Sequence, residues 1–102
     1  AHLVGVCGAG MKALAELLDG LGWRLSGSDL SAATTGIEAL MQRGLAFHQG
    51  HSGSNLPADT SCLIYSPAIP AENPERIEAA RRGLPQCSYG QMVGQLMQTR
   101  RG

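Results

Sequence analysis

Three glycines and one acid near the start of the chain have the types and spacing that phosphate binding requires. Gly5, Gly8 and Gly10 lie at the junction between an apolar run, residues 2–6, and apolar side chains that recur at helical spacing. A glycine turn that leads into a helix presents unpaired backbone N–H groups and the positive end of the helix dipole to an anion. We therefore expect Gly8 to let a phosphate approach the backbone, and Gly10 to let the start of the helix pack against the strand.

The glycine spacing departs from the dinucleotide fingerprint. G-x-G-x-x-G would place glycines at 5, 7 and 10, but position 7 is Cys7. The Cβ of Cys7 should crowd a pyrophosphate in the usual NAD position. Asp29 follows Gly10 by 19 residues, close to the spacing of an acid that accepts a hydrogen bond from a ribose hydroxyl. A tight turn followed by a surface Asp that caps the next helix fits the same residues, so both interpretations stay open.

Two further polar residues follow predicted strands. His51 comes after Gly50, where it either contacts a ligand or belongs to a plain loop, and Ser66 either meets a phosphate or sugar or caps a turn. His48 is interpreted as a strand-end residue. No Cys, Asp or Glu stands at metal-motif spacing beside His48 and His51, so we predict no metal site.

Catalytic machinery is not apparent in the sequence. Lys12 is the only lysine, and G-x-x-x-x-G-K-[ST], the loop that cradles ATP, does not occur. Neither G-x-S-x-G nor another nucleophile–base pair is evident. These residues predict a binding site without the groups that would carry out a reaction.

The elements that position these residues alternate along the chain. Asn73-Pro74-Glu75 is a strong helix start, and Ser88 to Gln91 have capping-box spacing. Such alternation predicts an α/β fold: a Rossmann-like, doubly wound, parallel five-stranded sheet with helices on both faces. The predicted strands are 2–6, 23–27, 45–48, 61–65 and 86–87, and the predicted helices are 11–21, 37–43, 74–82 and one that begins near 89.

Length and composition indicate one domain, residues 1–102. The chain is 43% hydrophobic and 16% charged with a formal net charge of zero, which argues against general attraction to nucleic acid or membrane. Three cysteines without metal spacing, of which we expect Cys62 and Cys87 to be buried, are typical of a reducing cytoplasm. The end at Arg100 to Gly102, with no closing turn or strand, looks like a cut between domains.

Together the motifs resemble the N-terminal domain of the Mur ligases, and the resemblance covers essentially the whole chain. It implies a three-domain cytoplasmic enzyme of peptidoglycan synthesis, and so of cell-wall biogenesis, cell shape and division. The first domain would hold a UDP-sugar, the central domain ATP with Mg²⁺, and the third the incoming amino acid. The motifs that carry the resemblance are the run from His2 to Met11, Ser26-Gly27-Ser28-Asp29, Gly50-His51, Ser66-Pro67-Ala68-Ile69 and Asn73-Pro74-Glu75.

The resemblance also implies roles for particular residues. Gly8, Ala9, Gly10 and Met11 would contact the diphosphate. The residues that would line the uridine side are Ser28, Asp29, His51, Ser66, Pro67, Ala68 and Ile69.

By the same resemblance, the chain would be the UDP-N-acetylmuramate-binding part of an ATP-dependent ligase that adds L-alanine. The domain would hold no cofactor and would not be catalytic alone. A cysteine at position 7 resembles the relatives that add a tripeptide, whereas the stretch from Ser66 to Ile69 resembles the relatives that add L-alanine. The alternatives are an NAD(H)-binding regulatory module that is not an enzyme, and the N-terminal half of a dehydrogenase; Cys7 disfavours both.

Overall fold

A computed structural model describes residues 1–101, with side chains up to residue 98. Gly102, the last residue of the predicted domain, lies outside the described residues. Strands and helices alternate along the described chain, as the sequence predicts. They are β1 (His2–Val4), α1 (Ala9–Gly20), β2 (Ser26–Asp29), α2 (Thr35–Gln42), β3 (Ala46–Gln49), the 3-10 turn η1 (Gly53–Asn55), β4 (Leu63–Tyr65), α3 (Pro74–Arg81), β5 (Gln86–Ser88) and α4 (Tyr89–Arg101).

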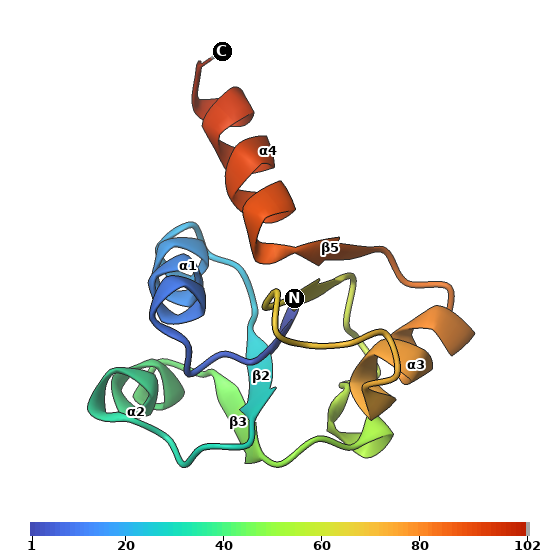
Figure 1. Ribbon diagram of the computed structural model, residues 1–102. Coiled ribbons are helices and arrows are strands. Elements are labelled where there is room, and N and C mark those ends of the chain that lie inside the picture. Colours follow the sequence, from blue (N-terminus) through green and yellow to red (C-terminus); the bar gives the residue numbers. More distant parts are fainter. Residues whose placement is uncertain (102) are drawn as a thin grey trace.

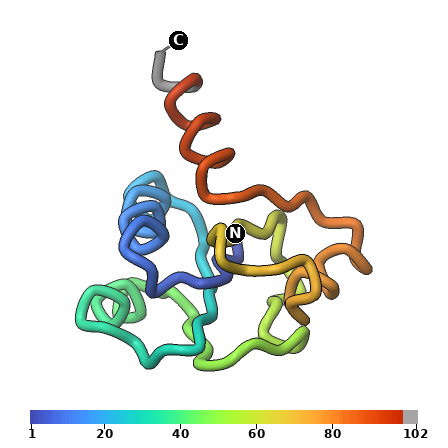
Figure 2. Tube along the Cα trace, viewed as in Figure 1, coloured from blue at the N-terminus to red at the C-terminus, as the bar shows by residue number. Residues whose placement is uncertain are grey.

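The strands form one parallel sheet in the order β3-β2-β1-β4-β5. Helices α1 and α2 lie on one side of the sheet and α3 on the other (Figure 1). The chain begins near the middle of the fold, and α4 extends away from it (Figure 2). This confirms the predicted Rossmann-like α/β fold. Because strand order reverses at β1, the turn after β1 opens at the crevice where such sheets bind ligands.

The two faces of the sheet have different cores. Leu3 of β1 and Ile64 of β4 face α1 and α2 in a wholly aliphatic cluster that Met92 of α4 completes. Val4 faces α3 in a smaller apolar cluster. Burying a side chain of this size contributes about 1.5–3 kcal/mol, so the α1 side supplies most of the hydrophobic stabilisation. The smaller cluster consists of Val4, Leu56, Leu63 and Ala79.

The predicted caps of the later helices are confirmed. Asn73 Oδ1 accepts hydrogen bonds from the N–H groups of Glu75 (2.8 Å) and Arg76 (3.4 Å) at the start of α3. Ser88 and Gln91 exchange the two bonds of a capping box, with Ser88 N–H donating to Gln91 Oε1 at 2.8 Å and Gln91 N–H donating to Ser88 Oγ at 3.2 Å.

Several strand boundaries differ from the predicted ones, and two of the differences have a clear local cause. The first strand ends at Val4 rather than at residue 6, because Gly5 has φ +86° and both Gly5 N–H and Val6 N–H donate to the carbonyl of Ser28. The second strand begins at Ser26 rather than at residue 23, because Trp23 N–H still bonds to a carbonyl of α1, that of Leu18.

Two further features concern the surface. Cys62 and Cys87 are half-buried, so the expectation that both are buried was wrong. Within residues 1–101, no helix combines the length and apolar character that crossing a bilayer would require.

Gly27 provides a test of the packing between sheet and loop. A methyl group on Gly27 would lie 3.0 Å from the Leu3 carbonyl oxygen and 3.2 Å from Val6 Cβ. Backbone and a β-branched side chain yield little, so we expect Gly27→Ala to lower the free energy of unfolding by about 1–3 kcal/mol. Gly94→Ala is the control, because nothing lies within 4 Å there and alanine in a helix should add up to ~1 kcal/mol. Urea unfolding measures both, and equal stability of the two variants would contradict the packing argument.

Candidate functional site at the carboxyl ends of the strands

The start of α1 is an uncapped helix N-terminus at the central strand. Gly8 is the N-cap and has no side chain to accept a hydrogen bond, and the first turn carries no acid. Among the described residues, the N–H groups of Ala9, Gly10 and Met11 have no acceptor, whereas Lys12 N–H already bonds to the Gly8 carbonyl. Three free N–H groups and the positive end of the helix dipole can therefore receive an anion.

The three glycines of this loop serve different purposes. Gly5 allows close approach of another loop, since a Cβ there would lie 3.0 Å from Ser66 Cβ. Gly10 accommodates the ring of Tyr89, which would lie 3.1 Å from an added Cβ, so its neighbour is Tyr89 rather than the strand. At Gly8 the nearest atom would be the Gly5 carbonyl oxygen at 3.5 Å, an ordinary contact. Packing does not require glycine at position 8, and the open space beside it is available to a ligand.

Asp29 braces the glycine loop from the end of β2. Its Oδ2 accepts the N–H of Cys7 at 3.0 Å, and its Oδ1 accepts the N–H of Ser31 at 2.9 Å. The Cys7 thiol points to the Ala32 carbonyl at 3.8 Å. Burial, with a smaller contribution from the Asp29 charge, raises the pKa of that thiol. Each Asp29 oxygen keeps a lone pair, so the carboxylate can hold the loop and accept one more hydrogen bond.

The other predicted site residues lie around the same edge. The loop from Ser66 to Ile69 covers Gly5, and its residues Pro67 and Ala68 are exposed. Ser66 Oγ accepts a hydrogen bond from Ala68 N–H at 3.4 Å, which is the turn cap that the sequence offered as one of two roles for Ser66. Because Met11 is only 3% exposed, only its N–H can reach a ligand.

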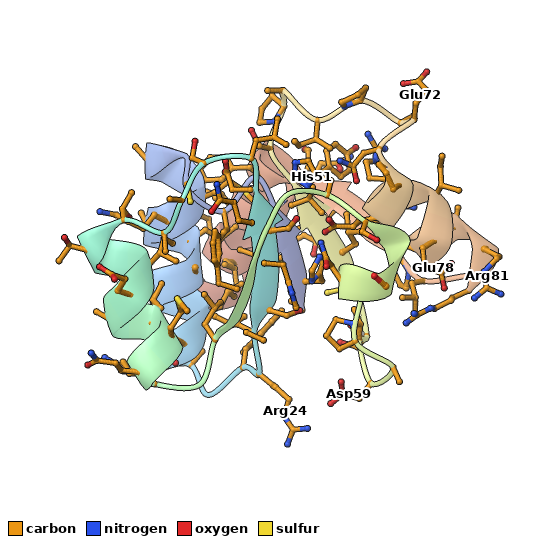
Figure 3. The ribbon with its side chains drawn as sticks, turned by 90° about the horizontal axis from the view of Figure 1, so that it is seen from below. Arg24, His51, Asp59, Glu72, Glu78 and Arg81 are labelled. Atoms are coloured by element: carbon orange, nitrogen blue, oxygen red, sulfur yellow. The ribbon has the colours of Figure 1, made fainter. Side chains whose placement is uncertain are left out.

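Ser28 and His51 are hydrogen-bonded to each other at the same edge of the sheet. The Ser28 side chain is fully buried, and its Oγ lies 3.0 Å from Nδ1 of His51. Ser28 can therefore act on a ligand only through His51, which is 12% exposed. Figure 3 shows His51 at the end of the molecule opposite to Arg24 and Asp59. The ligand-binding roles that the sequence predicts for the residues of this edge stay predictions.

A buried carboxylate that the sequence marks within a helix start, but not as a site residue, lies behind His51. Glu75, in the first turn of α3, is 0% exposed and faces the polar side chains of β1 and β2. No buried side-chain N or O atom in the described part of the chain lacks a hydrogen-bond partner. The groups bonded to this carboxylate are His2 Nε2, Ser28 Oγ (2.6 Å), Ser52 N–H (3.1 Å), Asn55 Nδ2 (3.1 Å) and His51 Nδ1 (3.2 Å).

These hydrogen bonds decide the charge of Glu75. Burial by itself raises the pKa of the carboxyl, but the hydrogen bonds from His2, Ser28 and Asn55 outweigh it and lower the pKa from 4.5 to about 2. Glu75 is therefore ionised, and hydrogen-bond donors surround its negative charge.

The sequence did carry a weak signal for Glu75. His2, Ser26 and Ser28 are polar residues in strands that a parallel sheet buries, and buried polar groups need partners. In the structure His2 Nδ1 lies 2.7 Å from Ser26 Oγ, while Nε2 bonds to the carboxylate. Nothing in the spacing shows that the partner is Glu75, because 73 residues separate it from His2.

Other places in the described chain fit a ligand less well. No group of three or more His, Cys, Asp or Glu side chains within residues 1–101 could hold a metal ion. A cavity of about 400 Å³ lies at the opposite edge of the sheet, between Trp23, Arg24 and Asp59. Because parallel sheets bind ligands at the carboxyl ends of their strands, we take the edge with the glycine loop as the candidate site.

The fold and the free helix terminus define a Rossmann-like domain whose glycine loop can receive an anion. The chain belongs to the Mur ligase family: the family model described as "Mur ligase family, catalytic domain" matches residues 1–101. A UDP-N-acetylmuramate–L-alanine ligase of Sulfurihydrogenibium sp. is 39% identical over 101 residues, 99% of this chain and 22% of that protein. The enzyme of the same name from Chlorobium phaeobacteroides is 42% identical over 97 residues, 94% of this chain and 20% of that protein.

Solved structures agree. The UDP-N-acetylmuramate–alanine ligase of Thermotoga maritima matches with a TM-score of 0.86 and 26% identity, over 96% of this chain and 22% of that one. A murein peptide ligase of Psychrobacter arcticus matches with a TM-score of 0.80 and 26% identity, over 92% of this chain and 20% of that one. The chain spans about a fifth of the length of these relatives. The comparisons do not support the NAD-binding alternative.

The donors around Glu75 predict how stability depends on pH. Its pKa in the folded protein is about 2 against an ordinary 4.5, so the unfolded chain binds the proton more tightly. The stabilisation is complete above pH ~5 and is lost as the pH falls through 4.5 toward 2, at most about 3 kcal/mol. We expect urea unfolding between pH 7 and 3 to show this loss in the unsubstituted protein and in the exposed control Glu38→Gln, but not in Glu75→Gln. An equal pH dependence in all three would contradict the prediction.

Proposed function

We propose that this chain is the UDP-N-acetylmuramate-binding domain of an ATP-dependent ligase that joins L-alanine to that nucleotide sugar in peptidoglycan synthesis. The observation that carries the proposal is the uncapped start of α1, with free N–H groups at Ala9, Gly10 and Met11, in a chain whose relatives are named for UDP-N-acetylmuramate. A diphosphate is the part of such a ligand that a helix N-terminus binds.

The nucleoside would lie to one side of the diphosphate. Asp29 is the last residue of β2, His51 follows β3, and the loop from Ser66 to Ile69 follows β4, so these groups border the glycine loop on both sides. The proposal places uridine among them. The relatives also include murein peptide ligases, and L-alanine is favoured because the curated relatives cited above carry that name.

The reaction itself belongs to parts of the longer protein. ATP with Mg²⁺ does not fit the residues of this chain, because no ATP-cradling loop is present and Lys12, the only lysine, lies against Gly36 of α2. We assign ATP and Mg²⁺ to the central domain and the incoming amino acid to the third, within one cytoplasmic polypeptide. There the substrate carboxylate would be phosphorylated and the amine of L-alanine would attack the acyl phosphate, so this domain supplies binding and orientation.

Gly8 offers a direct test of the diphosphate site. Gly8 has φ −63° and ψ 145°, which any residue adopts, and an added Cβ meets no close atom, so Gly8→Ala should fold with unchanged stability. The methyl group would fill the space that the diphosphate needs, and affinity should fall on the order of tenfold, about 1.4 kcal/mol. Calorimetry with UDP-N-acetylmuramate, UDP and NAD measures this, with Gly94→Ala as the control. Tight NAD binding without a response to either uridine nucleotide would overturn the proposed function.

Asp29 offers a second test, on the nucleoside side. Asp29→Ala removes an acceptor for a sugar hydroxyl and also the brace on Cys7 N–H, so uridine-nucleotide affinity should fall by ~1–2 kcal/mol. Calorimetry with UDP measures the change, and Asp59→Ala, at the opposite edge of the sheet, is the matched control. Unchanged affinity in Asp29→Ala would remove Asp29 from the site.

A further inference from the structure

We propose that Glu75 holds His51 in the tautomer with its proton on Nδ1, so that Nε2 stands at the site as a hydrogen-bond acceptor for an O–H or N–H donor of the ligand. The inference rests on the proposed function for the nature of that ligand. It adds Glu75 as a positioning residue and assigns His51 the role of hydrogen-bond acceptor, neither of which the family match supplies.

The count of protons around the carboxylate fixes the tautomer. Ser28 has a single hydroxyl proton, which it donates to Glu75 Oε1 at 2.6 Å. Toward His51 Nδ1, at 3.0 Å, Ser28 Oγ can therefore only accept. The ionised carboxylate also only accepts, and its Oε2 lies 3.2 Å from the same Nδ1. Both neighbours of Nδ1 are acceptors, so Nδ1 must carry the hydrogen.

The other ring nitrogen faces outward. Nε2 of His51 has no hydrogen-bond partner among the described residues, and no buried side-chain nitrogen among them lacks one, so Nε2 reaches solvent. The ring is otherwise enclosed, with 12% of the side chain exposed. With the proton on Nδ1, the neutral imidazole presents a lone pair at Nε2.

The geometry around His51 leaves the ring little freedom to exchange roles. Ser52 N–H and Asn55 Nδ2 bond to the same Oε2, each at 3.1 Å, and Asn55 Nδ2 also donates to the Gly50 carbonyl at 3.1 Å. The residues on either side of His51 are thus tied to the carboxylate. Turning the ring by about 180° around χ2 would bring Cδ2, a carbon, to the place of Nδ1, and would leave Glu75 Oε2 and Ser28 Oγ without the hydrogen bond from His51.

An acceptor at this position selects for ligand groups with a hydrogen to donate. In a uridine nucleotide these are the ribose hydroxyls and the N–H of the uracil ring. Cytosine has no hydrogen on the corresponding ring nitrogen. Donation by ribose and donation by the base are therefore distinguishable with CDP and with the 2′-deoxy form of UDP.

Long-range ¹H–¹⁵N correlation spectra of the imidazoles test the inference in the unsubstituted 102-residue chain at pH 8. The chain has three histidines. We expect His51 to carry its proton on Nδ1 and His2 on Nε2. His48, whose imidazole has no hydrogen bond among the described residues, serves as the unconstrained reference. A His51 with its proton on Nε2 would overturn the inference before any ligand is added.

Two variants separate the roles of the neighbours. Ser28→Ala should keep the proton on Nδ1, because Glu75 still accepts it, whereas Glu75→Ala should lose the preference. If Glu75→Ala does not fold, the spectrum of the unsubstituted chain still decides the tautomer. Loss of the preference in Ser28→Ala alone would assign the positioning role to Ser28 and contradict the proposal.

Titration with UDP completes the test. We expect the Nε2 resonance of His51 to move as a donor bonds to it, and His51→Phe to weaken UDP binding on the order of tenfold. A shift with UDP but not CDP identifies the uracil N–H as the donor, and a shift with both but not with 2′-deoxy-UDP identifies the 2′-hydroxyl. Binding of UDP that shifts the Gly8 amide but leaves His51 Nε2 unmoved contradicts this inference alone. Absence of any UDP binding contradicts the proposed function as well.

Discussion

The charge of Glu75 is the constraint on which the α3 side of the structure depends. A carboxylate removed from water is costly unless hydrogen bonds replace its hydration. The replacing donors come from β1, from β2 and from the loop that follows β3, as in His2, Ser28 and Asn55. One ionised group therefore connects the central strand, its neighbour, the candidate site and helix α3. This requirement accounts for the buried polar side chains of β1 and β2, which are His2, Ser28 and, through His2, Ser26.

Local rules made most of the fold predictable from the sequence. Asn73 and the Ser88–Gln91 capping box fix helix starts through bonds that span at most three residues, and the alternation of strands and helices follows from short-range periodicity. The misplaced boundary at Trp23 has a local cause too, because its N–H completes the end of α1. Glu75 could not be found in this way, since its contact with His2 forms only after the chain has folded.

The glycine loop shows why a sequence motif can be found correctly and interpreted incorrectly. Gly5 and Gly10 are required by neighbours that are distant in sequence, the loop at Ser66 and the ring of Tyr89. Only Gly8 borders open space. In the G-x-x-G-x-G spacing, packing requires two of the glycines and leaves Gly8 free for the proposed ligand. Comparison with the dinucleotide fingerprint treats all three positions as binding positions.

The free N–H groups at the start of α1 have a consequence for how the domain discriminates between ligands. Main-chain amides sense charge and distance but carry no information about what the phosphates are attached to. Any nucleoside diphosphate present in the cell would satisfy Ala9, Gly10 and Met11 about equally, and the abundant adenine nucleotides would compete for them. Under the proposed function, selectivity must therefore come from side chains on the flanking loops. Changes in those loops, rather than in the glycines, are then the route by which related domains could acquire a different nucleotide.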